Sequence, residues 1–177
     1  MNRRKALKTM AVGAAAAAVV APQARAASKE VDLFARRWKT SKEFTLQVAD
    51  AMPEDSYTFK PNTEIREFGK LMQHLALNNA FYIARFKGGT SPLKEPPTSD
   101  KESVKKILAE SFDWCAEVIA GLTEEDLDKS YPGRNPNQPP QSGRDWVLTA
   151  FLHTAHTRGY ADMYLRGKNL TPPRYMS

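Results

Sequence analysis

Three histidines are the side chains best suited to bind a metal or transfer a proton in this sequence: His74, His153 and His156. Imidazole titrates near neutral pH and is the commonest metal ligand among side chains. His153 and His156 share one predicted helix near the C-terminus. Each helical residue turns by about 100°, so His153 falls on an inward-facing stripe and His156 lies about 60° away from it. The stripe consists of Trp146, Ala150, His153, Thr157, Tyr160 and Tyr164.

His74 lies on a second predicted helix, on the flank of its apolar stripe. The same helical spacing aligns it with Asn78, Phe81 and Arg85. A flank position can still point inward, because each helix of a bundle contacts two neighbours. Two roles therefore stay open for His74: a hydrogen-bonded structural residue and a metal ligand.

The other reactive side chains have simpler interpretations. Cys115, the only cysteine, falls on an apolar helix face, which favours a small core residue over a nucleophile. Arg158 could bind an anionic substrate, but helical phase predicts that it lies on the outer half of its helix. Gly159 next to it is expected to allow close helix packing. The sequence contains no nucleophile elbow, no phosphate-binding glycine-rich loop and no CxxC pair.

Residues 1–26 have the composition of an export signal. Arg3 and Arg4 precede a short alanine-rich apolar stretch, and Ala24-Arg25-Ala26 has the form of a cleavage site. The apolar stretch is shorter than the roughly 18 to 20 residues that span a bilayer, so no stable membrane anchor is expected. The arginine pair and the weak hydrophobicity favour the twin-arginine (Tat) machinery over Sec. The predicted location is the periplasm or the outside of the cell.

The charge of the chain depends on this segment. It holds five of the 26 basic residues and none of the 20 acidic ones, which leaves residues 27–177 with a net charge of about +1. A nucleic-acid-binding protein needs a surplus of cations to displace counterions from phosphate, so nucleic acid is excluded as a partner. Residues 27–177 have the length of one domain.

The periodicity of apolar residues predicts four long helices and no sheet. Ser99 is the predicted cap of the third helix, with Glu102 completing a capping box. Thr123 is the predicted cap of a short additional helix. Four amphipathic helices of this length predict an all-α, four-helix bundle, in which the proline-rich residues 132–140 cross one end and shape a mouth. The long helices are expected at residues 29–51, 64–87, 100–121 and 144–167.

Three segments carry a resemblance to a known family through their order and spacing. They are MPEDSYTFKP (52–61), FGKLMQHLA (68–76), and HTAHTRG (153–159) running on to PPRY (172–175). Together they span nearly the whole chain after residue 26. The chain resembles the DinB/YfiT-like superfamily of metal-binding four-helix bundles.

The resemblance implies a divalent metal, zinc or nickel, held by one histidine of the second helix and an i, i+4 pair of the last. Such a triad leaves an open coordination position, which in thiol-dependent transferases, isomerases or hydrolases would activate a thiol or water. His74 matches the first ligand and His153 the second. The third position is Thr157 in this chain. His156 matches an extra histidine that members often carry.

This departure leaves three interpretations open. The preferred one is that a stable metal site is lost and the remaining histidines are buried polar residues with hydrogen-bond partners. The second is a shifted triad of His74, His153 and His156, because i, i+3 residues share a helix face. The third is a weak site of two histidines completed by a carboxylate or water.

Two functions from different classes follow from these interpretations. One is an exported DinB-like protein with a partly retained histidine metal site, acting as a binding or accessory protein. The other is a divalent-metal-dependent thiol transferase or hydrolase that uses His74, His153 and His156. Either function is compatible with a small-molecule substrate and with a homodimer.

Overall fold

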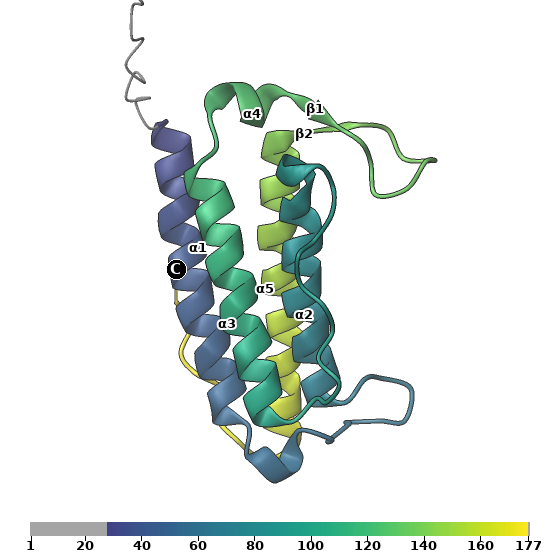
Figure 1. Ribbon diagram of the computed structural model, residues 1–177. Helices are drawn as coiled ribbons and strands as arrows, with labels where there is room; N and C mark the ends of the chain where they lie inside the picture. The colour runs from purple at the N-terminus through teal and green to yellow at the C-terminus, as the bar shows by residue number, and fades with distance from the viewer. Residues whose placement is uncertain (1–27, 177) are drawn as a thin grey trace, which may run out of the picture.

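The architecture is a bundle of four long helices that lie side by side (Figure 1). The computed structural model describes residues 28–176, so the predicted export signal lies outside the described residues, as does Ser177. The prediction of an all-α, four-helix bundle is confirmed. No helix within residues 28–176 is long and apolar enough to cross a membrane. The long helices are α1 (Lys29–Ala51), α2 (Phe68–Ile83), α3 (Lys101–Ala120) and α5 (Gly143–Gly167).

Side chains cap the helices close to the predicted positions. The Ser28 hydroxyl accepts hydrogen bonds from the backbone N–H of Glu30 and Val31 at the start of α1. Asp100 caps α3 by accepting from the backbone N–H of Ser103, one residue later than the predicted Ser99. The predicted cap Thr123 is confirmed for the short helix α4 (Glu124–Asp128).

Helices α1 and α5 run in one direction along the bundle, and α2 and α3 run in the other (Figure 1). Because α2 and α3 are consecutive and parallel, the extended residues 88–100 return along the whole bundle between them. Hydrogen bonds join α3 to both neighbours. Trp38 of α1 donates through Nε1 to the carbonyl of Phe112, and Ser111 donates to the carbonyl of Ala76 in α2.

Helix α2 is shorter than predicted. It begins at Phe68 instead of residue 64, and it ends in the 3₁₀ turn η2 (Ala84–Lys87). Another 3₁₀ turn, η1 (Glu54–Ser56), and a loop lie between α1 and α2. Residues 60–67 form this loop and project from the side of the bundle (Figure 1).

The buried core follows the predicted stripes, but two residues of α5 differ from their predictions. Trp38 and Trp146 are fully buried, as are Phe112 and Cys115. Tyr160 was predicted to face the core but is 53% exposed, because at this depth α5 faces the hollow beside α2. The prediction for Arg158 was also wrong. It is only 7% exposed, and its guanidinium donates to Ser41 and Thr45 of α1.

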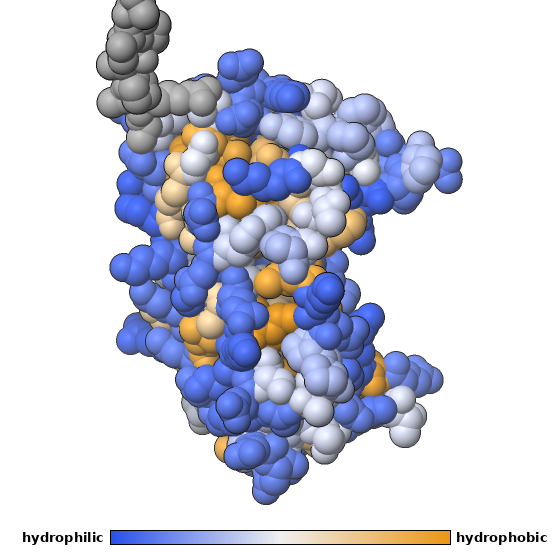
Figure 2. Space-filling model, in the orientation of Figure 1, coloured by the Kyte–Doolittle hydropathy of each residue, from blue (hydrophilic) through white to orange (hydrophobic). Residues whose placement is uncertain are grey.

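The proline-rich residues 132–140 lie at the end of the bundle that holds α4 (Figure 1). Contrary to the prediction of no sheet, the short strands β1 (Ser130–Tyr131) and β2 (Gln141–Ser142) pair in antiparallel fashion at the base of this loop. This loop and the loop of residues 60–67 project from the same side of the molecule, and the surface between them is hollowed (Figure 2).

Candidate functional site

Helices α2 and α5 bring two of the three predicted site residues together. The imidazole rings of His74 and His153 have centroids 5.2 Å apart with 63° between their planes. Close by, the hydroxyl of Thr154 donates to the side-chain oxygen of Asn79 at 2.7 Å and joins the two helices. The phenol ring of Tyr82, with its centroid 5.4 Å from that of His153, flanks the pair.

The two rings differ in their hydrogen bonds. The side-chain amide nitrogen of Asn78 lies 3.0 Å from Nδ1 of His74 and donates to the His74 carbonyl at 2.8 Å. The same amide nitrogen lies 3.5 Å from Nε2 of His74, so the Asn78 amide contacts both ring nitrogens. Nδ1 of His153 is buried and finds no hydrogen-bond partner within residues 28–176.

The surroundings favour the neutral form of both rings. Burial lowers the pKa of His153 to about 4, with further lowering from the nearby His74 and His156. Burial also lowers the pKa of His74, and so do the positive charges of Arg66 and Arg134. Near neutral pH the pair therefore presents uncharged imidazoles, which donate or accept hydrogen bonds.

The third predicted residue does not join the pair. His156 is exposed, and its ring packs against Tyr160 with 4.7 Å between centroids. Thr157, one turn after His153, is buried with 3% exposure. Across residues 28–176 no group of three or more His, Cys, Asp or Glu side chains could hold a metal ion. The donors present, two imidazoles and a threonine, do not fit a metal centre with three strong protein ligands.

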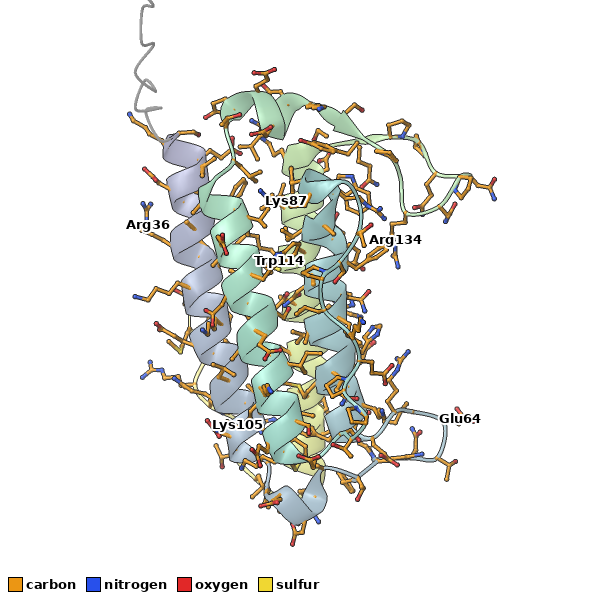
Figure 3. The ribbon with its side chains drawn as sticks, in the orientation of Figure 1. Arg36, Glu64, Lys87, Lys105, Trp114 and Arg134 are labelled. Carbon is orange, nitrogen blue, oxygen red and sulfur yellow. The ribbon has the colours of Figure 1, made fainter. Side chains whose placement is uncertain are left out.

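Loops from both ends of the bundle border the hollow that lies between them (Figure 2). Glu64 and Arg134, one from each loop, lie on the same side of the bundle (Figure 3). The guanidinium of Arg134 lies 5.5 Å from the ring centroid of Tyr82. At the other end, the hydroxyl of Tyr164 donates to the carbonyl of Arg66 at 2.6 Å and fixes the loop to α5. A cavity of about 550 Å³ there is lined by Glu64, Ile65, Arg66, Leu71, Tyr160 and Tyr164.

Sequence reasoning did not single out these two arginines as site residues. Arg66 and Arg134 come from loops, where side-chain direction does not follow from helical spacing. The proline-rich composition around Arg134 was the only available signal, because it indicated a long connection at one end of the bundle.

Cys115 behaves as the sequence predicted. It is fully buried among core residues, and burial raises the pKa of its thiol well above the ordinary value. A thiol that stays protonated is a poor nucleophile. Cys115 is therefore a core residue and lies outside the site.

The family follows from the sequence together with this fold. Residues 37–161, more than half of the chain, match the family model of the DinB superfamily. The chain belongs to the DinB superfamily. This result confirms the family resemblance for residues 52–61, 68–76 and 153–159, while residues 172–175 lie outside the match. Within this superfamily, the chain is 22% identical over 123 residues to the protein YjoA of Bacillus subtilis (strain 168), covering 69% of this chain and 80% of YjoA.

Solved structures of DinB-like proteins share the fold. The crystal structure of YjoA from Bacillus subtilis superposes with a TM-score of 0.69 at 19% identity, over 82% of this chain and 99% of YjoA. A DinB-like protein from Bacillus cereus ATCC 10987 gives a TM-score of 0.71 at 16% identity, over 82% and 97% of the two chains. A conserved protein from Enterococcus faecalis gives 0.65 at 16% identity, over 80% and 98%. At these identities the likeness concerns the fold alone.

Proposed function

We propose that this DinB-superfamily protein is exported, retains two histidines of a metal site, and binds a small molecule in the hollow beside α2 and α5. The observation that carries the proposal is the residue one turn after His153. Thr157 occupies this buried position, where the family resemblance implies a third imidazole ligand. Two imidazoles compete poorly with water for a divalent cation without a third strong ligand.

The contacts of the pair support binding without a resident metal. The Asn78 amide already contacts the His74 ring, with its nitrogen 3.0 Å from Nδ1 and 3.5 Å from Nε2. The lowered pKa values of His74 and His153 keep both rings neutral near pH 7. A neutral imidazole pair beside the ring of Tyr82 suits an uncharged, hydrogen-bonding part of a small molecule.

The two arginines suggest what else the ligand carries. Arg66 and Arg134 approach the pair from opposite loops, and neither forms an ion pair with another residue in the part of the chain that the structure describes. Two positive charges that act on neutral imidazoles favour a ligand with a carboxylate or phosphate group. The cavity of about 550 Å³ beside Arg66 has the size of a small-molecule site.

Export is the second part of the proposal. It is supported by the sequence of residues 1–26, with Arg3 and Arg4 before a short apolar stretch and a cleavage site. The Tat machinery carries folded proteins, so the bundle would assemble in the cytoplasm and act in the periplasm or outside the cell.

A second candidate function is a metal-dependent thiol transferase or hydrolase that uses His74, His153 and His156. One observation favours it: Nδ1 of His153 is buried without a partner within residues 28–176, as a ligand atom would be before a metal binds. His156 would have to leave Tyr160 for the three imidazoles to converge.

Elemental analysis of the full chain, purified after folding in the cytoplasm, separates the two functions. The first predicts far less than one zinc or nickel ion per chain. A stoichiometric metal in the wild type that is lost in His156→Ala would establish the enzyme site instead. Gln47→Ala is the matched control, because Gln47 is an exposed polar residue of α1, outside the two helices that carry the histidines. This control should leave the metal content of the chain unchanged.

A further inference from the structure

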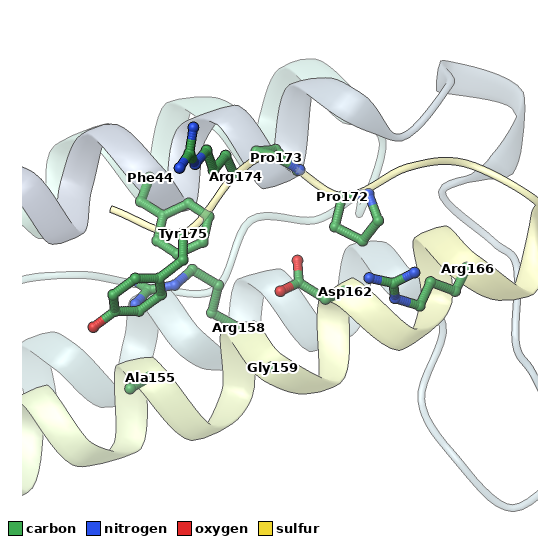
Figure 4. A pocket seen from close by; sticks show the side chains of 10 residues that line it. All are labelled: Phe44, Ala155, Arg158, Gly159, Asp162, Arg166, Pro172, Pro173, Arg174 and Tyr175. Atoms are coloured by element: carbon green, nitrogen blue, oxygen red, sulfur yellow. The ribbon is translucent and has the colours of Figure 1, made fainter. Parts of the chain in front are cut away.

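A second cavity lies on the other side of α5, facing α1 and the C-terminal tail (Figure 4). Its volume is about 440 Å³, within the range of small-molecule sites. It is separate from the histidine pair, which lies between α5 and α2. It is lined by Phe44, Ala155, Arg158, Gly159, Asp162, Arg166, Pro172, Pro173, Arg174 and Tyr175.

The tail that closes this cavity is held at both ends. Asn169 adopts a left-handed φ of 59°, which asparagine tolerates, and the chain reverses there after α5. The N–H of Leu170 then donates to the carbonyl of Leu165 at 2.9 Å. Further along, the ring of Tyr175 packs edge-on against Phe44, with 5.8 Å between centroids.

The buried side chain of Arg158 lines the cavity between α1 and α5. Its guanidinium lies 4.3 Å from the ring centroid of Phe44 and donates to the hydroxyls of Ser41 and Thr45 at 3.1 and 3.2 Å. These contacts hold the Phe44 ring in place and provide hydrogen-bond acceptors for the Arg158 guanidinium. Arg166 and Arg174 remain as the exposed cations of the cavity.

The carboxylate of Asp162 lies near the charges of Arg158 and Arg166 but lacks a hydrogen-bond donor at Oδ1 among the described residues. Oδ1 of Asp162 is buried and accepts no hydrogen bond from any residue in the range 28–176. Burial raises the pKa of this carboxyl, while the nearby positive charges of Arg158 and Arg166 lower it. Arg166 and Arg174 are exposed, and neither forms an ion pair with a described residue. One carboxylate and two exposed arginine residues therefore line the cavity, with the Arg174 guanidinium drawn on the α1 side of the tail (Figure 4).

We infer that this cavity binds a free α-amino acid with an apolar side chain. The ammonium group would donate to Asp162, and the carboxylate would accept from Arg166 and Arg174 as a charge-assisted pair. Phe44, Pro172, Pro173 and Tyr175 supply an apolar wall for the side chain. A simple anion would leave Asp162 without a donor, and a simple amine would leave both arginines without an acceptor.

Calorimetric titration of the full chain with three related probes tests this inference. L-phenylalanine carries both charged groups, 3-phenylpropionate lacks the ammonium, and phenethylamine lacks the carboxylate. We expect L-phenylalanine to bind at least about tenfold more tightly than either analogue, because each analogue leaves one charged partner unsatisfied. Asp162→Asn should reduce the preference for L-phenylalanine over 3-phenylpropionate. Arg174→Gln should weaken the binding of both probes that carry a carboxylate, L-phenylalanine and 3-phenylpropionate.

Arg36→Gln is the matched control, since Arg36 is exposed on α1 away from the cavity (Figure 3). It should bind L-phenylalanine like the wild type. Circular dichroism checks that every variant keeps its fold. Equal binding of L-phenylalanine and 3-phenylpropionate would overturn the inference in favour of an anion site. Absence of binding, or binding that Asp162→Asn and Arg174→Gln leave unchanged, would overturn it altogether.

Discussion

His74 and His153 face each other across helices α2 and α5 with their ring centroids 5.2 Å apart, yet the buried residue one turn further along α5 is Thr157. The bundle of this chain thus holds two imidazoles together, and the position one turn after His153 carries a threonine. What the pair does depends on the protonation of its rings and on that third position.

Acidification should destabilise the protein through His153. Its pKa in the folded chain is about 4, below the ordinary value near 6.5, so the unfolded chain takes up the proton first. The stabilisation from the neutral ring is complete above about pH 6.5 and is lost as the pH falls towards 4. Melting temperatures measured from pH 7.5 to pH 4 with a chelator present should therefore fall less steeply in His153→Leu than in the wild type. An identical slope in both proteins would contradict the assignment.

Two glycines should respond in opposite directions to alanine. Gly159 lies inside α5, and apart from its own neighbouring helix backbone no described residue comes within 4 Å of a Cβ added there, so the predicted role in close helix packing is wrong. Gly159→Ala should raise the free energy of unfolding by about 0.5 to 1 kcal/mol, because it lowers the entropy of the unfolded helix segment. A Cβ on Gly69 would collide with the carbonyl oxygen of Ser99, so Gly69→Ala should destabilise by about 1 to 3 kcal/mol. Urea unfolding of the two variants measures both changes.

The aromatic core should be sensitive at Trp38 and insensitive at Tyr160. Trp38 is fully buried, donates to the Phe112 carbonyl at 3.0 Å, and packs against Phe151. Trp38→Ala should lower the free energy of unfolding by about 3 to 5 kcal/mol. Tyr160→Ala should change it by no more than about 0.5 kcal/mol, since that ring is 53% exposed. Equal losses in urea unfolding would place Tyr160 in the core, as its helical phase first suggested.

Export should depend on the arginine pair at the N-terminus. Replacing Arg3 and Arg4 together by lysine keeps the charge but removes the feature that Tat signals share. Cell fractionation should then find the protein in the cytoplasm with residues 1–26 still attached. Lys5→Arg is the control and should be exported normally. Unchanged export of the double variant would indicate the Sec route.

The sequence predicted most of the fold because its helices are long and strongly periodic. Helix α1 has the predicted bounds of 29–51, and Cys115 is buried as its helical phase required. The start of α2 was wrong, since residues 64–67 continue a loop that a tertiary bond from Tyr164 to the Arg66 carbonyl holds in place. A hydrogen bond between distant segments produces no periodic pattern in the sequence, so it could not be predicted from periodicity.

The candidate site was only partly predictable for the same reason. Helical spacing and the family resemblance brought His74 and His153 into one hypothesis. The burial of Arg158 depends on α1 and on the tail that returns after Asn169, and the exposure of Tyr160 depends on the hollow beside α2. Neither arrangement follows from the spacing of residues on α5 alone.

The most direct test of the account is a calorimetric titration of zinc into the wild type and Thr157→His. The substitution completes an i, i+4 pair with His153 opposite His74, so zinc affinity should rise by about 100-fold or more, with proton release and a metal-dependent rise in melting temperature. Thr157→Leu adds similar bulk without a ligand atom and should bind zinc as weakly as the wild type. Stoichiometric, tight zinc binding by the wild type that Thr157→His does not improve would contradict the account.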